Sequence, residues 1–418
     1  MRRENTIANM DWLTVFLYLT LVFFGWLSIF SAASDEDVVR VFDLSQRFGK
    51  QILWIGLALV IAIVILIIDA NFFSTFSFII YFSILLLLIA VLLFGKTVAG
   101  SKSWIEIGSI SLQPAEFAQF ATALALAKYL SIRNIDMGNL KTKLISVTII
   151  TLPSLLILLQ NDTGSALVYA AFVLVLYREG ISGAFIVIGV FAALLFIITL
   201  LFGELWVLSG IVLFTALVIL LFKKIRKRFK IILAGFLVSI IFIFSVNYAY
   251  ENILAAHQKK RINVMLGIEK DPHGAGYNVN QSKIAIGSGG LKGKGFRQGM
   301  LTRYHFVPEQ TTDFIFCTVG EEWGFIGTTV VIFLFVFLLI RLIFLAERQK
   351  SHFSRIYGYG VASIFFFHFA INIGMTIGLA PVVGIPLPFF SYGGSSLWAF
   401  TILLFIFIKQ DANRMSVL

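Results

Sequence analysis

The sequence has little of what enzymes use for redox and metal chemistry. Cys317 is the single cysteine among 418 residues, so an intrachain disulfide is impossible and redox chemistry is not expected. No cluster of His, Cys, Asp and Glu has the spacing of metal ligands, so no metal site is predicted. The five histidines, which show no paired spacing, are His257, His273, His305, His352 and His368.

Charged residues are also scarce, and long apolar runs take their place. Only 13% of the residues are charged, whereas a soluble domain carries about 25%. Runs of about 20 apolar residues are long enough to cross a bilayer as helices. We therefore predict an all-α, polytopic integral membrane helical bundle. The twelve expected transmembrane helices lie near 12–33, 52–69, 76–95, 114–131, 143–160, 165–178, 183–202, 205–222, 231–249, 325–345, 356–379 and 394–409.

The positions of Lys and Arg predict the orientation of these spans. They gather in the loops that would be cytoplasmic if the N-terminus is cytoplasmic, most of all in KKIRKRFK at 223–230. The short loops at 160–164 and 203–204, on the other side, hold none. Both termini are then cytoplasmic, and the net charge of +11 calls for no nucleic acid partner. The expected parts are spans 1–9 over 1–249, an extracytoplasmic catalytic loop over 250–324 and spans 10–12 over 325–418.

The N-terminal apolar run is expected to stay in the protein as the first span. No cleavage site with small residues follows it, so it does not have the pattern of a removed signal peptide. We interpret KKIRKRFK as a topology anchor in preference to a site for a specific lipid.

Two polar stretches on the predicted outer face carry acidic residues. Residues 96–120 (KTVAGSKSWIEIGSISLQPAEFAQF) read as a turn-rich, re-entrant segment in which Trp104 suits the membrane interface. Glu116 falls in the first turn of a helix, where a carboxylate complements the helix dipole, but a carboxylate there needs a partner. Asp162 lies in the tight turn QNDTGSAL, and its residue types suit helix capping and a functional role equally well.

A third stretch, GLAPVVGIPLPFFSYGGSSL at 378–397, interrupts the helical pattern with proline and glycine. Irregular backbone at membrane depth survives only where protein or a water-filled cavity satisfies its polar groups. We therefore expect this stretch to form the wall of a cavity, with an ordinary loop as the alternative.

The longest polar interval, 271–327, is rich in glycine and in charge of both signs. GSGGLKGKGFRQG is like a phosphate cradle but lacks the Gly-Lys-Ser/Thr order of a P-loop. The cations of the interval 271–327 and its borders could bind a diphosphate, although a place in a solvated, flexible loop is the simpler interpretation of each of them. The cations are Lys283, Lys292, Lys294, Arg297 and Arg303.

Asp313 is the sharpest candidate for a general base. It lies in PEQTTDFIF, where polar sequence turns into a span, so burial would tend to raise the pKa of its carboxyl. Glu309 would share a face with Asp313 if the segment were helical, and Glu321 and Glu322 follow shortly after. These residues predict a site on the outer face, but they do not name its substrate.

These motifs together resemble the SEDS family (shape, elongation, division and sporulation). The resemblance rests on WIEIGSISLQPAEFAQ, QNDTGSAL, DPHGAGYNVNQSKIAIGSGGLKGKG, FVPEQTTDFIF with GEEWGFIG, and GIPLPFFSYGGSSL, in this order over most of the chain. The motif QSKIAIGSGGLKGKG is similar to that of the RodA-like branch of the family, which acts in elongation and cell shape.

The resemblance implies a peptidoglycan glycosyltransferase that polymerises lipid II into β-1,4-linked glycan strands on the outer face of the cytoplasmic membrane. The family's essential aspartate corresponds to Asp313. A class B penicillin-binding protein would supply transpeptidation, and other elongation-complex membrane proteins would be neighbours. The resemblance implies no certain cofactor and leaves open whether a divalent cation assists. The expected substrate-binding residues are Trp104, Glu116, Asp162, Lys283, Lys294, Arg303, Glu309, Ser391 and Gly393.

The chain departs from the family pattern in two places. The family has ten spans, and the two additional ones here form a hairpin within 205–249. Gln119 stands where the family's PSEFAK motif has lysine, so Glu116 must find another partner. Two other functions are weighed against the enzyme: a lipid II flippase, and a non-catalytic scaffold for a transpeptidase.

Overall fold

The computed structural model describes residues 6–33, 42–98, 100–108, 110–133, 135–221, 229–252, 256–266, 268 and 275–415. It divides into two compact units, Met1–Ile181 with Asn278–Leu418, and Ser182–Tyr277. The basic run at 223–230 lies largely outside the described residues, as do Arg2, Arg3 and residues 271–274 of the first loop motif.

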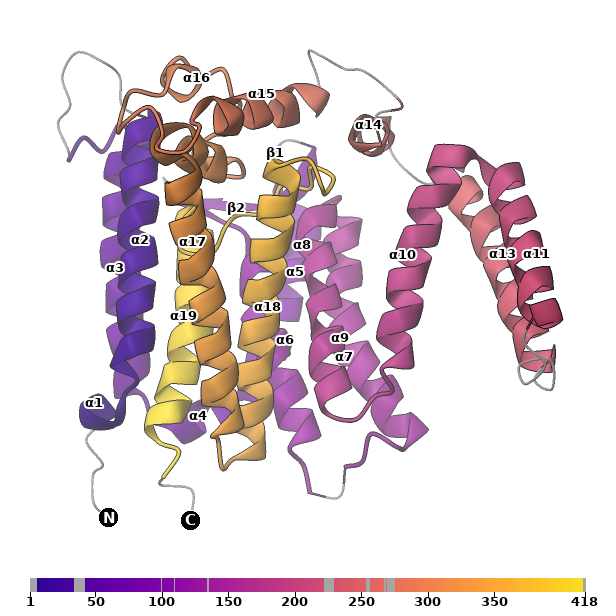
Figure 1. Ribbon diagram of the computed structural model, residues 1–418. Helices are drawn as coiled ribbons and strands as arrows, with labels where there is room; N and C mark the ends of the chain where they lie inside the picture. The colour runs from indigo at the N-terminus through magenta and orange to yellow at the C-terminus, as the bar shows by residue number, and fades with distance from the viewer. Residues whose placement is uncertain are drawn as a thin grey trace. The chain divides into compact units, whose positions relative to one another are not determined.

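The larger unit is a helical bundle. α1 and the C-terminal end of α19 lie at one end of it, which we call the termini-side end, and α15 and α16 lie at the other (Figure 1). Its elements are α1 (Thr6–Asn9), α2 (Trp12–Ala33), α3 (Arg47–Ile67), α4 (Ala70–Thr75), α5 (Ser77–Phe94), α6 (Pro114–Leu130), α7 (Leu140–Leu159), α8 (Thr163–Leu167), η1 (Val168–Ala171), α9 (Phe172–Arg178), α15 (Ala275–Ser288), α16 (Met300–Arg303), α17 (Ile315–Glu347), α18 (His352–Thr376) and α19 (Gly394–Ala412).

The predicted membrane bundle is confirmed. Within the described residues, ten helices are long and apolar enough to cross a bilayer. The two other expected spans are shorter: α6 has 17 residues, and residues 163–178 form the composite segment α8–η1–α9. α19 packs on α3, α6 and α18 and is almost wholly buried, which suits a helix that is apolar all round.

The smaller unit holds the additional hairpin that the sequence predicts within 205–249. Its helices are α10 (Ala184–Phe202), α11 (Glu204–Leu221), α13 (Phe229–Asn252) and α14 (Ala256–Met265). Leu195, Val207 and Ile243 form its core. Nδ2 of Asn247 donates a hydrogen bond to the carboxylate of Glu204 (3.2 Å), so α11 and α13 also share a polar contact.

Residues 96–112 fold as a small antiparallel sheet and not as the re-entrant segment expected from the sequence. The strands are β1 (Lys96–Val98), β2 (Ser101–Ile107) and β3 (Ile110–Leu112), in the order β1-β2-β3. Lys96 faces Trp104 across the first pair, and its Nζ lies 2.8 Å from the carboxylate of Glu106. The sheet lies toward the end of the bundle that carries α15 (Figure 1).

α17 begins ten residues before the tenth span predicted at 325, and the predicted start falls directly after a break in the helix at Gly324. This residue has φ 63° and ψ −155°, a backbone conformation open to glycine alone. The break leaves backbone groups without helical partners, and the glycine-rich stretch 289–295 supplies new ones. Two bonds donate into the stretch: the amide of Phe325 to the carbonyl of Gly290 (2.8 Å) and the amide of Ile326 to that of Leu291 (3.2 Å). Two run the other way: the amide of Lys294 to the carbonyl of Glu321 and the amide of Gly295 to that of Glu322 (3.0 Å each).

These hydrogen bonds require very close contact between the two backbones, which explains why glycine occupies positions 289 and 293. A Cβ at Gly293 would lie 2.0 Å from the carbonyl oxygen of Glu322, and one at Gly289 would lie 2.0 Å from that of Gly320. The interpretation of 289–295 as a free, solvated loop is therefore wrong. We call this contact between 289–295 and the break in α17 the glycine joint.

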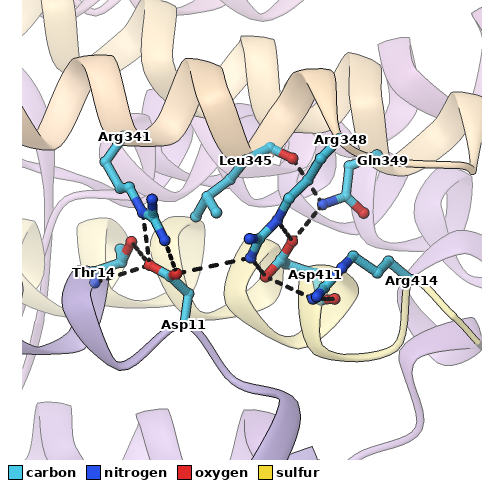
Figure 2. A network of polar contacts seen from close by, with 8 residues as sticks. All are labelled: Asp11, Thr14, Arg341, Leu345, Arg348, Gln349, Asp411 and Arg414. Carbon is cyan, nitrogen blue, oxygen red and sulfur yellow. Dashed lines mark hydrogen bonds and ion pairs between the residues drawn. The ribbon is translucent and has the colours of Figure 1, made fainter.

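A buried polar cluster lies at the termini-side end of the same unit (Figure 2). Asp11 accepts hydrogen bonds from Arg341 of α17 and from the amide of Thr14 (3.0 Å). Burial alone would raise the pKa of Asp11, but the hydrogen bonds from Arg341 and Thr14 outweigh it and hold the pKa below its usual value. Arg348 bridges the cluster to Asp411 of α19, so the start of α2, the end of α17 and the end of α19 are joined.

Candidate active site

Asp313 lies in a series of turns directly before α17. Its backbone carbonyl accepts a hydrogen bond from Nδ2 of Asn372 on α18 (2.9 Å), and its side chain is partly buried. The carboxylate lies beside the 378–393 segment, because a Cβ at Gly384 would be 3.4 Å from Oδ2 of Asp313. The candidate base is thus fixed by α18 and faced by the proline-rich segment.

The 378–393 segment is irregular, and several of its polar groups form hydrogen bonds within the protein. The Ser391 hydroxyl donates to the carbonyl of Thr312 (2.7 Å) and accepts from the amide of Leu387 (2.8 Å). The amide of Tyr392 donates to the carbonyl of Thr311 (2.8 Å). Ser391 therefore binds the segment to the turns that carry Asp313, which is the condition for such backbone at membrane depth.

Glu116 and Asp162 belong to the same site as Asp313. Glu116, in the first turn of α6, is only 7% exposed and lies beside Ser395 of α19, while its Oε2 is buried without a hydrogen-bond partner in the described part of the chain. It interacts electrostatically with both Asp162 and Asp313. Ser395 is thus the polar neighbour that the sequence left unnamed. The site gathers three carboxylates from α6, the start of α8 and the turns before α17.

Asp162 caps α8 and also reaches the site. One carboxylate oxygen accepts the amide of Ser165 (3.0 Å), which is the capping role. The other oxygen accepts Nε2 of Gln113 (2.7 Å), the residue before α6. The backbone amide of Gln113 donates to the hydroxyl of Ser395 (3.0 Å). The capping role weighed for Asp162 is therefore confirmed, and its functional role stays a prediction.

Glu309 is close to Asp313 in the chain, but the two do not share a helical face. The segment forms turns, and Glu309 has a left-handed φ of 53°. Its carboxylate lies 3.7 Å from Nη1 of Arg47, which also donates to the hydroxyl of Thr311 (2.6 Å). Arg47 therefore brings a positive charge to the turns before α17.

Lys294 is held by the glycine joint. Its Nζ lies 2.7 Å from Oε1 of Glu321, which is fully buried and also accepts the amides of Leu301 (3.0 Å) and Thr302 (2.8 Å). Glu322 accepts hydrogen bonds from the hydroxyl of Ser31 and from the amide of Arg297 (3.2 Å). Glu321 and Glu322 thus fasten the glycine-rich stretch and do not join the three carboxylates.

The remaining predicted residues lie on several elements. Lys283 is exposed on α15, and a Cβ at Gly378 would be 3.6 Å from its Nζ. Arg303 is exposed at the end of α16. Trp104 is partly buried on β2, opposite Lys96. The amide of Gly393 donates to Oε1 of Gln51 on α3 (3.2 Å), so this glycine ties the start of α19 to α3.

Sequence reasoning missed Arg47, Gln113, Ser395 and His368 as parts of this region. Arg47 carries one signal, because it is a charged residue shortly before an apolar run. The other three contact their partners across long sequence distances, as with His368 and Gln119, 249 positions apart. In the described part of the chain no group of three or more His, Cys, Asp or Glu is placed to hold a metal ion.

Comparison with known proteins identifies the family. The cell cycle protein family of FtsW, RodA and SpoVE matches residues 11–215 and 207–415. This chain belongs to that family. Among its relatives, the peptidoglycan glycosyltransferase RodA of Treponema pallidum is 32% identical, and the alignment covers 99% of this chain and 100% of the relative. The peptidoglycan glycosyltransferase MrdB of Escherichia coli K12 is 31% identical, over 93% and 90%.

Solved structures share the fold of this family member. A chain of a peptidoglycan synthase complex, described as coordinating polymerization and crosslinking, superposes with a TM-score of 0.71 at 25% identity, covering 97% of this chain and 98% of that one. RodA of Thermus thermophilus gives a TM-score of 0.62 at 25% identity, over 97% of each chain. The protein is therefore an integral membrane protein of the SEDS type, as its motifs predict.

Proposed function

We propose that this protein is a peptidoglycan glycosyltransferase that polymerises lipid II into β-1,4-linked glycan strands during elongation and shape maintenance. Membership of the family and the activity in the names of its relatives support this proposal. The observation that carries it is the placement of Asp313, a partly buried carboxylate fixed by Asn372 and grouped with Glu116 and Asp162.

Asp313 is proposed as the general base. It removes the proton from the 4-hydroxyl of the acceptor GlcNAc, and that oxygen attacks the anomeric carbon of the donor MurNAc. The bond from this carbon to undecaprenyl diphosphate breaks, and the diphosphate leaves with the electron pair. Glu116 would line the substrate cavity and Asp162 would orient or support it, held in place by the hydrogen bond from Gln113.

The diphosphate leaving group needs positive charge nearby. Lys283, Lys292 and Arg303 are the exposed cations among the five that the sequence singles out, and Arg47 adds another beside Glu309. Lys294 is proposed for support of the loop instead, since Glu321 neutralises its charge. Trp104, Ser391 and Gly393 would shape the surroundings of the substrate.

The orientation and the partners belong to the same proposal. The Lys and Arg of the short loops favour cytoplasmic termini, which would place Asp313, at the other end of the unit, on the outer face of the cytoplasmic membrane. A class B penicillin-binding protein would crosslink the strands, in line with the similarity to a chain of a synthase complex that couples polymerization with crosslinking.

The proposal is tested by replacing Asp313 with asparagine, which keeps the size of the side chain and removes the base. Polymerisation of lipid II by the purified protein with its transpeptidase is expected to fall about 10²–10⁴-fold, the usual contribution of a general base. Asp136→Asn is the matched control, because Asp136 is exposed in the turn between α6 and α7 and asparagine keeps the acceptor that bonds the amide of Gly138.

Equal polymerisation by the wild type and Asp313→Asn would remove Asp313 as the base and move the search to Glu309 and to Glu116 and Asp162, the other carboxylates of the site. If the folded wild type makes no polymer while labelled lipid II crosses liposome membranes, the protein is a flippase. If it does neither but still binds the transpeptidase, the scaffold interpretation holds.

A further inference from the structure

A buried histidine on α18 is used by none of the steps above. His368 is 2% exposed, and its ring packs edge-on against Phe400 with the centroids 4.8 Å apart. Its Nδ1 lies 3.2 Å from the carbonyl oxygen of Pro386, and its Nε2 lies 3.1 Å from Oε1 of Gln119 on α6. Both ring nitrogens thus have a polar partner in an otherwise apolar setting.

The chemistry of these two partners fixes the form of the ring. The Pro386 carbonyl can only accept, so Nδ1 must carry a proton. If Nε2 carried one as well, the ring would be a cation, and a buried cation is strongly unfavourable unless it is paired. No carboxylate is among the groups that act on His368 in the described part of the chain. A neutral ring protonated at Nδ1 needs a donor at Nε2, which requires the Gln119 side-chain amide to be turned over so that its NH₂ group takes the place of Oε1; both orientations fit the same heavy-atom positions.

His368 acts together with Asn372, which lies one turn further along the same face of α18. Nδ2 of Asn372 donates to the carbonyls of Ile385 (2.7 Å) and Asp313 (2.9 Å), and His368 holds the next carbonyl, that of Pro386. Two consecutive peptide groups are thus fastened to α18 directly after Gly384, the residue that faces the Asp313 carboxylate.

We propose that His368, as the neutral Nδ1–H tautomer with Gln119 as donor to Nε2, is a positioning residue for Asp313. It keeps residues 384–386 at the distance from the Asp313 carboxylate that proton removal requires, and Gln119 ties the same ring to α6, one turn from Glu116. The role in catalysis rests on the proposed function, whereas the tautomer does not. In this arrangement Gln119 contacts His368, and Glu116 lies beside Ser395.

The tautomer is tested on the wild-type protein labelled with ¹⁵N-histidine in lipid nanodiscs. The His368 signal is assigned as the one missing from His368→Gln. It is expected to show a protonated Nδ1 and an unprotonated Nε2 at neutral pH. A protonated Nε2, in either the other tautomer or the imidazolium, overturns the proposal. This measurement needs no activity, so it stands apart from any failure of the proposed function.

The positioning role is tested by kinetics of lipid II polymerisation. His368→Leu removes the donor to Pro386 and is expected to lower kcat about 10–100-fold with KM within about two-fold, because small displacements at a reacting group are costly. His368→Gln keeps a donor and is expected to restore most of kcat. His352→Leu, the same change at an exposed position at the start of α18, is the matched control. A loss confined to KM, or equal losses in the leucine and glutamine variants, contradicts the proposal.

Discussion

Gly293→Ala is expected to destabilise the protein by roughly 2–5 kcal/mol and to lower glycan synthesis by about 10²-fold. The added Cβ would lie 2.0 Å from the carbonyl oxygen of Glu322 and 2.6 Å from Cα of Trp323. These are backbone atoms that cannot turn aside, and Gly293 also has a φ of 79° that disfavours alanine. The glycine joint must therefore open, and the break in α17 loses its four substitute hydrogen bonds.

The effect on activity follows from what the glycine joint holds. Glu321 lies beside the break and fastens Leu301 and Thr302, and the chain then runs through α16 into the turns that carry Asp313. Nε2 of Gln310 adds a bond to the carbonyl of Thr302 (2.6 Å). A displacement of the glycine joint would therefore also displace α16 and the turns that carry Asp313.

The matched control is Gly287→Ala in the same region. A Cβ there meets nothing within 4 Å, and the residue is helical within α15, so alanine is expected to leave stability unchanged or raise it by up to about 1 kcal/mol. The thermal unfolding midpoint, hydrogen exchange at the amides of 290–295 and polymer yield are measured on both. If Gly293→Ala matches Gly287→Ala in all three, the close contact is not required and the account of the break at Gly324 fails.

The membrane bundle is predictable from the sequence because its signal is local. An apolar run of span length is sufficient to locate a helix, and the second unit was found as an additional hairpin for the same reason. The acidic residues Glu116, Asp162 and Asp313 were selected because each stands where polar sequence meets a span. The bundle then brings the three together, since all these junctions fall on one side of it.

The contacts that hold the site could not be predicted from the sequence. α17 extends back to Ile315 across the break at Gly324. It can do so because a stretch about thirty residues earlier in the chain supplies hydrogen-bond partners to the backbone at the break. Lys294 looks like a free phosphate ligand until the structure shows it beside buried Glu321. Ser395 and His368 look like ordinary residues of spans, because their partners Glu116 and Gln119 lie on another helix.

The largest purely structural effect is expected from Asp411→Ala. Asp411 is fully buried at the end of α19, and its carboxylate accepts two hydrogen bonds from Arg348 (2.9 and 2.5 Å) and one from Nε2 of Gln349 (2.7 Å) (Figure 2). Removing one partner of a buried ion pair leaves the other charge uncompensated, which costs about 3–5 kcal/mol. A loss of this size is expected in the free energy of unfolding, read as a lower denaturation midpoint in detergent.

Glu347→Ala is the control for Asp411→Ala, because it removes a carboxylate from an ion pair that is half exposed. Glu347 lies next to Arg348 in sequence and pairs with Arg178 at 2.9 Å, with exposed fractions of 49% and 47% for the two side chains. An exposed pair of this kind contributes about 0–1 kcal/mol. The burial of Asp411, and not its charge alone, is what makes the difference. Equal destabilisation by the two variants would mean that the cluster of Asp11, Arg341, Arg348 and Asp411 does not hold α2, α17 and α19 together.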